Sequence, residues 1–403
     1  ATLEPFRDFK IDLNASRTMT RAKSVQYMYR GNPTTHSGTF TMTTMSLGSA
    51  LEGSGSQSNG FHSKTFEKFC NSLEGFRQRV EAQYSGARYP EGTALAGQPF
   101  DAAKYGGVSQ YSADVMVPAF LNAYTSMGGN DLSPFPSLAK LLPNWTLRYS
   151  GLGQLTWFRN KFKSVNINHG YKSIYAVGSY SSFSTFQEFM NGLGFISDAA
   201  TSNPIPNSMY NISQVSINEA FSPLLGIDVT LHNGMTLKGE YRTTRVINLS
   251  MTSVQISETT SKDWVFGMGY KIQDFRLLGG TNHRKVKGSG KKGSGNDDDN
   301  NKNKNSTKRN TRRNGFSHDL NLRLDLSFRK QAAINRDIAS MVSTATSGNN
   351  AFKLSFSADY AMSRLMTMSF YFDRQSNTPL LSNNSYPTTT QDFGLSLKFS
   401  LAR

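Results

Sequence analysis

The sequence predicts an all-β protein, a transmembrane antiparallel β-barrel with a helical insertion, on the basis of three observations. The first is an alternation of apolar and polar residues that recurs along the chain. Successive side chains of a strand point to opposite faces, so each such segment has one apolar and one polar face. The clearest example contains Leu320, Leu322, Leu324, Leu326 and Phe328, and further examples are residues 264–272, 352–360, 366–372 and 393–401.

The second observation is the length of these segments. They extend over about 10–14 residues, whereas crossing a bilayer at a slant takes about 9–11 and an average strand has roughly 5–6. The third is the placement of aromatic residues near segment ends, as at the two membrane surfaces of β-barrels. These aromatic residues are Trp145, Tyr149, Tyr270, Tyr360, Tyr371 and Phe372.

The polar faces of the predicted strands carry full charges. In the segment that begins at residue 320, the residues predicted to face the lumen are Asn321, Arg323, Asp325 and Arg329. A water-filled interior accommodates such charges, whereas a packed core does not. Alternation alone also fits a soluble β-sandwich or barrel with one wet face, which is the alternative fold.

Composition excludes several classes of protein. The 403 residues are 37% hydrophobic and contain no apolar run near the ~18–20 residues of a membrane-spanning helix. The single cysteine, Cys70, excludes a disulfide framework and a Cys-rich metal site. Half of the net charge of +16 lies between Arg284 and Arg313, in a Gly-, Ser-, Asn- and Lys-rich stretch. This stretch lacks the aromatic residues that stack on bases, so we expect a solvated loop and no nucleic-acid partner.

The pattern divides the chain into five parts. We expect barrel strands in residues 1–51, a helical and Gly/Pro-rich insertion between strands in 52–142, and barrel strands again in 143–278. A basic disordered loop follows in 279–316, and C-terminal barrel strands in 317–403. About a dozen strands result, including 9–29, 39–47, 145–153 and 165–177, and a hairpin that turns at Asn233-Gly234.

Two segments of the insertion have helical spacing. In residues 63–84 the apolar positions are separated by three or four residues, and Ser63 is the expected N-cap. Residues 112–127 are apolar almost throughout and contain Pro118. We therefore predict two helices that interrupt the strand pattern, and a packed, inert Cys70 in the first of them.

No catalytic, cofactor-binding or metal-binding motif is present. No two of the six histidines are three to five residues apart, so a helical His-pair metal site is excluded. The Gly-Ser-Lys run at 288–295 lacks the spacing of a phosphate loop, and the acidic run at 297–301 lacks the Gly and Glu of a calcium loop. We expect a protein that is not an enzyme and has no cofactor.

The C-terminal segment contains a polar-x-Gly-x-x-apolar-x-aromatic arrangement, formed by Asp392, Gly394, Leu397 and Phe399. This arrangement resembles the assembly signal of the last strand of bacterial outer-membrane barrels. Four further residues follow Phe399, whereas the terminal residue of the signal is usually aromatic. We predict that these residues form a barrel-assembly signal.

Several sequence blocks resemble the C-terminal portion of a known family, the outer-membrane translocon of the type IX secretion system of Bacteroidetes (SprA/Sov family). They occur in family order over nearly the whole chain. The blocks are residues 64–69, 114–121, 142–152, 245–257, 267–272, 321–327 and 371–401.

The resemblance implies that the chain is part of a very large barrel in the outer membrane of a Gram-negative bacterium, where it passes folded cargo proteins to the cell surface. It also implies outer-membrane lipid, cargo proteins, a small partner barrel at a lateral opening and a plug protein as partners. The N-terminus has neither Met nor an apolar signal core, so we expect a fragment of a longer protein. Two alternatives remain, namely a complete smaller porin or transporter barrel of about twelve strands and a soluble basic nucleic-acid-binding protein.

If the C-terminus is periplasmic, counting strands gives an orientation. The loops at 334–350 and 377–386 are then extracellular, and the turns at 233–234 and 361–363 periplasmic. The basic segment is periplasmic as well. The count does not place the insertion on either side.

Overall fold

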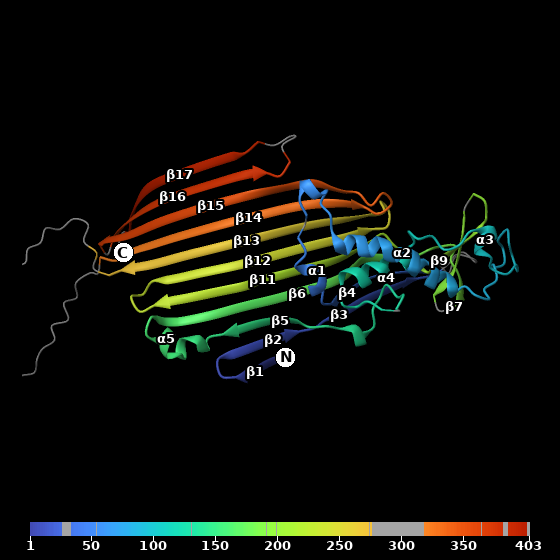
Figure 1. The fold of residues 1–403 in the computed structure, drawn as a ribbon, viewed down its shortest axis with the longest axis horizontal. Coiled ribbons are helices and arrows are strands. Elements are labelled where there is room, and N and C mark those ends of the chain that lie inside the picture. The colour runs from blue at the N-terminus through green and yellow to red at the C-terminus, as the bar shows by residue number, and fades with distance from the viewer. Residues whose placement is uncertain are drawn as a thin grey trace, which may run out of the picture.

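A computed structural model describes residues 1–25, 34–53, 55–129, 131–190, 192–198, 200–273, 275, 318–363, 365–381 and 386–400. The basic segment 279–316, which the sequence predicts to be disordered, lies outside these residues. The described chain is mostly antiparallel β-sheet with few helices, so the all-β prediction is confirmed at this level (Figure 1).

The main element is one long sheet of 14 strands with antiparallel neighbours (Figure 1). Among the described residues, its main path ends at β1 and β17, which do not pair with each other, and β3 is a further edge strand because it pairs with β4 alone. In spatial order, the strands of the main path are β1 (Thr2–Phe6), β2 (Phe9–Asn14), β5 (Asn144–Tyr149), β6 (Phe162–Ser182), β11 (Gln214–Leu231), β12 (Thr236–Ser250), β13 (Gln255–Ile272), β14 (Leu320–Asp337), β15 (Ser343–Ser363), β16 (Met366–Pro379) and β17 (Thr388–Phe399).

Three further strands join this sheet beside the main path. β3 (Arg17–Ser24) pairs with β4 (Thr35–Thr43), while β4 and β10 (Tyr210–Ile212) pair with β6. The predicted strand 9–29 is therefore wrong as a single strand. Its described residues form β2 and β3, which pair with two different strands, β5 and β4.

The insertion leaves the sheet between two strands, β4 and β5, that occupy the same position beside β6. β4 and β5 both pair antiparallel with β6, β4 at Ile174–Ser181 and β5 at Ile167–Tyr171, so they lie end to end. At the junction, Thr44 N donates to Ser173 O (3.1 Å), and Ser173 N donates to the Asn144 side chain (2.8 Å). The insertion predicted between strands is therefore an excursion of the chain from within one line of strands, between β4 and β5.

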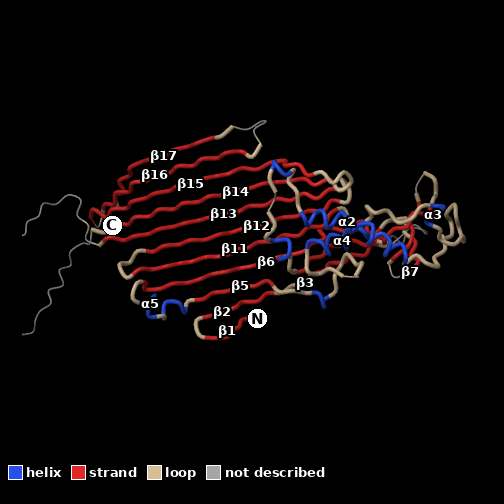
Figure 2. Tube along the Cα trace, viewed as in Figure 1, coloured by secondary structure: helices blue, strands red, loops and turns tan. Residues whose placement is uncertain are grey.

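The insertion contains most of the helical structure, which gathers at one end of the sheet (Figure 2). Ser63 caps α2 by accepting a hydrogen bond from Phe66 N (3.2 Å), so the predicted helix and its N-cap are confirmed. The predicted helix 112–127 is confirmed as α4, with Pro118 inside it. The helices are α1 (Leu47–Ala50), α2 (Lys64–Ala82), α3 (Ala102–Tyr105), α4 (Ala113–Tyr124) and α5 (Thr156–Arg159), with short 3₁₀ helices at Gln57–Asn59, Leu138–Lys140 and Gly151–Gln154.

A second, small sheet was not predicted. It consists of β7 (Gln187–Met190), β8 (Leu193–Ser197) and β9 (Pro204–Ser208). Tyr84 holds it to the insertion by donating to Gly194 O and Asn207 O, at 3.0 and 3.2 Å. Residues 143–278 therefore contain an element outside the long sheet, because these short strands lack the long alternation that identifies the others.

Several strand limits differ from the prediction. The predicted strand 145–153 ends at Tyr149, and a 3₁₀ helix begins at Gly151. The predicted strand 39–47 ends at Thr43, before α1. β6 has 21 residues and exceeds the predicted 165–177 at both ends. The hairpin at Asn233-Gly234 is confirmed, with Gly234 at a φ of 84°, which a residue without Cβ adopts without strain.

Candidate functional site

The register of the long strands gives the sheet one continuous apolar face. Trp264 lies opposite Phe328, which lies opposite Phe352, and Met268 is level with Leu324 and Phe356. The bulge in β11 between Phe221 and Leu225 adds two residues, so the alternation stays in phase with β12. We call the surface that carries these side chains the apolar face.

The half of the apolar face that lies away from the insertion, here called the exposed half, is open to its surroundings. The most exposed large side chains of this half are between 37% and 76% exposed, which includes Phe393 at 76% and Trp264 at 49%. An apolar surface of this extent is rare on a soluble monomer. The most exposed members are Leu225, Ile227, Leu237, Trp264, Phe266, Phe328, Phe370, Phe393, Leu395, Leu397 and Phe399.

The opposite side of the sheet, the polar face, carries charged pairs. Arg329 Nε lies 2.8 Å from Asp263 Oδ1, and Lys271 Nζ lies 2.7 Å from Asp319 Oδ2. The four residues predicted to face a lumen all lie on this face of β14 and are exposed, namely Asn321, Arg323, Asp325 and Arg329.

A cavity of about 730 Å³ opens on the polar face where β2, β5, β6, β11 and β12 meet. Its wall combines acidic and basic side chains with amides. Asn168 Nδ2 donates to Asp228 Oδ2 across it (2.8 Å), while Glu240 pairs with Lys238 and Arg242. The cavity is therefore strongly polar with both signs of charge, like the rest of this face.

The predicted assembly signal lies on β17, an edge strand. Asp392 and Gly394 are level with Asp373 and Tyr371 on the polar face, whereas Leu397 and Phe399 are on the apolar face. A Cβ at position 394 would lie 2.5 Å from the Tyr371 ring. Only glycine therefore lets this ring cover the strand, an arrangement that stabilises glycine in exposed strands.

The other half of the apolar face, here called the covered half, lies beneath the insertion. Phe69, Leu73 and Phe76 of α2 and Val117 and Phe120 of α4 belong to one buried cluster. The sheet contributes Phe40, Met42, Tyr175, Val177, Val215, Ile217, Ile247, Leu249 and Ile256 to the same cluster. Cys70 is buried with them, and burial raises the pKa of its thiol to about 11, which agrees with the predicted inert role.

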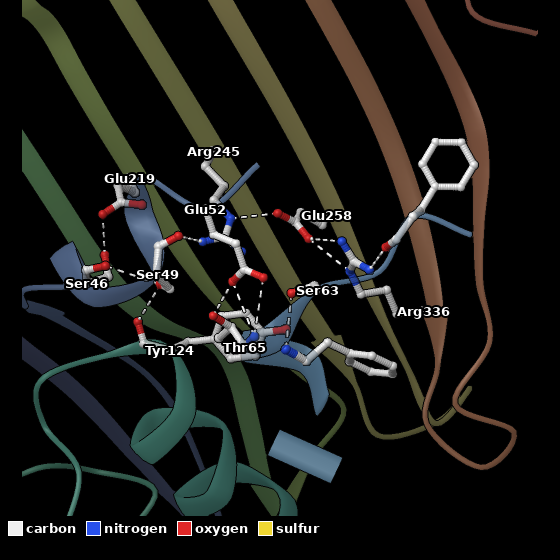
Figure 3. Close-up of polar contacts among 12 residues, drawn as sticks. Ser46, Ser49, Glu52, Ser63, Thr65, Tyr124, Glu219, Arg245, Glu258 and Arg336 are labelled. Atoms are coloured by element: carbon white, nitrogen blue, oxygen red, sulfur yellow. Dashed lines mark hydrogen bonds and ion pairs between the residues drawn. The ribbon is translucent and has the colours of Figure 1, made fainter. Parts of the chain in front are cut away.

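Charged residues are buried where the insertion meets the sheet (Figure 3). Glu258 of β13 accepts from Arg245 Nε of β12 at 2.7 Å and from Arg336 Nε of β14 at 3.0 Å. Their side chains are at most 5% exposed. We call these three residues the buried ion-pair cluster.

The two arginines of this cluster also hold the chain that leads into α2. Arg245 Nη1 donates to Ser49 O (2.7 Å), and Arg336 Nη1 donates to Phe61 O (2.6 Å) (Figure 3). A buried guanidinium needs several acceptors to offset the loss of water. The sheet thus fixes the insertion by hydrogen bonds to its backbone at two points.

Two further groups secure the same segment. Ser46 Oγ donates to Glu219 Oε1 of β11 (2.6 Å), which also accepts from Tyr171 OH (2.9 Å). Glu52 accepts from Lys64 N (2.5 Å) and from Thr65 N and Oγ1 at the start of α2. Although burial acts to raise it, these hydrogen bonds hold the pKa of Glu52 below its ordinary value.

The sequence analysis missed these buried charges. A signal was present, because Arg245, Glu258 and Arg336 occupy apolar-face positions next to Ile247, Ile256 and Ile334. A charge within an otherwise apolar stripe requires a buried partner. Their mutual pairing, however, depends on the register of three strands that are distant in sequence.

Among the described residues, no group of three His, Cys, Asp or Glu side chains could hold a metal ion. Within the same residues, no helix combines the length and apolar character that crossing a membrane requires. The chain matches no protein-family model, and no curated protein matches it either.

Proposed function

We propose that this chain forms part of the wall of an outer-membrane β-barrel, and that the barrel is the protein-conducting channel of a type IX secretion system. The observation that carries the proposal is the two-faced sheet. One face is apolar and exposed across β11 to β17, and the other carries ion pairs and exposed charged side chains. Lipid on one side and water on the other match this distribution.

The extent of the exposed half supports a bilayer. On β13 and β14 it runs from Trp264 to Ile272 and from Leu320 to Phe328, nine residues on each strand. Nine residues rising about 3.3 Å each span roughly 25–30 Å along the strand, close to the apolar band of about 25 Å of outer-membrane barrels. The aromatic side chains of Trp264, Phe328 and Tyr360 lie at its two ends, as in an interfacial girdle.

In the proposed mechanism this chain lines the passage and does not itself supply energy for transport. The polar face lines a water-filled passage, and its ion pairs keep charges in fixed positions along the wall. Gating then depends on partners, a plug protein and a small partner barrel, as the family resemblance implies.

The proposal also gives the insertion a location. It covers the apolar face and therefore lies on the outer surface of the wall, beside the bilayer and not within the passage. It shares one end of the sheet with the β14–β15 turn after Asp337 and the β12–β13 turn after Ser250 (Figure 1). With a periplasmic C-terminus, that end is extracellular.

The second candidate is a complete smaller porin-like barrel. In a closed barrel of this chain alone, the first and last strands would pair. Among the described residues β1 and β17 instead form two separate edges (Figure 1). The open edges favour a wall that is completed by further strands.

Spin labels at neighbouring positions test the wall. In a Cys70→Ser background, labels at Leu324→Cys and Asp325→Cys lie on opposite faces of β14. After reconstitution into lipid vesicles, we expect the label at 324 to be accessible to oxygen and the label at 325 to a water-soluble nickel complex. Equal accessibility to the nickel complex at both positions would exclude a membrane wall.

The size of the native polypeptide separates the two barrels. Peptides of this chain in an outer-membrane protein several times larger than 44.6 kDa support the translocon. A native outer-membrane protein near 44.6 kDa would refute it and favour the smaller barrel.

A further inference from the structure

A pair of cations lies at the boundary between the two halves of the apolar face. Lys262 of β13 and Lys330 of β14 lie directly opposite each other, one position beyond Trp264 and Phe328. On β16, Arg374 follows Phe372 on the same face, but it lies opposite Leu354 and level with Leu326, and therefore inside the exposed half. All three side chains belong to the apolar face, because they alternate in phase with its aromatic residues.

Among the described residues, no carboxylate pairs with these three cations. Thr243 and Asn350 flank the two lysines in the register, and Gln391 lies opposite Arg374. None of the ion pairs in the described part of the chain includes Lys262, Lys330 or Arg374. The nearest acid on the apolar face of β13 is Glu258, which the two buried arginines already occupy. Like charges directly opposite each other destabilise a sheet. A bound anion would therefore stabilise the pair Lys262 and Lys330.

Two cavities meet at the lysines. One, of about 380 Å³, lies between them and the insertion, with Phe61 and Ile334 in its wall. The other, also about 380 Å³, lies on the opposite side, against Trp264, Phe328 and Phe352. The lysines thus separate a space roofed by the insertion from an aromatic groove that leads into the exposed half. Each is within the size range of small-ligand sites.

We propose that Lys262 and Lys330 bind the phosphate of an anionic membrane lipid, whose acyl chains lie along Trp264, Phe328 and Phe352. This inference rests on the proposed function, since it requires lipid against the exposed half. Charge complementarity selects the phosphate, and continuity with the exposed apolar surface selects a lipid over a free anion.

The test compares two double variants of the full chain. Lys262→Gln with Lys330→Gln removes the cations of the proposed site, and Lys353→Gln with Lys398→Gln removes two lysines of the polar face. Binding of dioleoyl phosphatidylglycerol, dioleoyl phosphatidylcholine and inorganic phosphate is measured by native mass spectrometry of the detergent-solubilised protein. Insertion into vesicles is measured in parallel.

For the unaltered chain we expect preferential retention of phosphatidylglycerol over phosphatidylcholine. Each lysine near a membrane surface contributes about 1 kcal/mol, so the first double variant should lose roughly 10- to 30-fold of that preference. The polar-face variant should retain it, and both should insert normally.

Two results overturn the inference alone, with insertion intact. One is an unchanged preference in the first variant, and the other is inorganic phosphate binding at these lysines as tightly as the lipid. If the unaltered chain fails to insert, the proposed function fails and this inference fails with it.

Discussion

The covered and exposed halves belong to the same face of the same strands, yet they carry different residues. In the covered half, the stripe contains Glu219, Arg245, Glu258 and Arg336 among its apolar positions. In the exposed half, the stripe on β13 and β14 from Trp264 and Phe328 onward is apolar without interruption. This difference in residues reflects the different environments of the two halves, the insertion for the covered half and, in our proposal, lipid for the exposed half.

A folded insertion can satisfy a buried charge with carbonyl and hydroxyl groups at fixed positions. Ser49 O and Phe61 O accept from the two arginines, and Ser46 donates to Glu219. Lipid tails offer no such partner, so a charge in the exposed half would remain unsatisfied. On β13 and β14, the first charges next to the exposed half, Lys262 and Lys330, therefore mark where one environment ends and the other begins.

The largest expected effect comes from Glu258→Gln in the covered half. This change leaves Arg245 and Arg336 buried without a counter-charge, which typically costs about 3–5 kcal/mol. We expect the insertion to detach locally, with faster proteolysis near Ser49 and Phe61. Limited proteolysis and the midpoint of thermal unfolding measure the effect.

Asp325→Asn is the matched control, because it removes an exposed carboxylate of the polar face. It should leave both readouts within experimental error. Equal proteolysis of the two variants would show that the buried ion-pair cluster does not hold the insertion.

A charge in the exposed half tests the other side of the comparison. Leu324→Arg places a guanidinium in the middle of the apolar face, level with Met268 and Phe356. In the middle of a bilayer such a change costs about 2–4 kcal/mol. We expect a lower urea midpoint for the vesicle-embedded protein.

Ser355→Arg is the corresponding change on the polar face, since Ser355 lies opposite Asp325. It should cost little, because water and a nearby carboxylate receive the charge. If both arginine variants lower the urea midpoint equally, the two faces do not meet different solvents.

The smallest of these effects concerns pH and the junction of α4 with β9. Burial raises the pKa of Asp114 to about 6, although hydrogen bonds from Ser208 act against it. The folded state thus favours the protonated form of Asp114. Its contribution to the free energy of unfolding is fully present below about pH 4 and is lost as the pH rises through about 6. The shift corresponds to at most ~3 kcal/mol.

Hydrogen exchange of α4 and β9 between pH 4 and 8 measures this dependence, and Asp114→Asn should abolish it. Asp198→Asn is a useful control of opposite sign. Backbone hydrogen bonds from Thr201 and Ala200 lower the pKa of Asp198, so its contribution is lost as the pH falls. If the protection of α4 and β9 from hydrogen exchange still falls with rising pH in Asp114→Asn, Asp114 is not the cause of that fall.

Much of the fold could be predicted because the segments with strand or helix periodicity are long. Nine residues of strict alternation in β14 identify a strand and both of its faces, and the spacing of Phe66, Phe69, Leu73 and Phe76 identifies α2. The short strands β7, β8 and β9 have too few residues to show a period. The break between β2 and β3 depends on their partners, and no local pattern records it.

The sequence by itself determined the long strands, their two faces and the two long helices of the insertion, because local periodicity is a property of neighbouring residues. Tertiary structure alone decided that the insertion leaves from within a strand line and covers the apolar face. It also decided that Arg245, Glu258 and Arg336 meet, and that Lys262 faces Lys330. These contacts depend on strand register, and register is set by pairing between segments far apart in the chain.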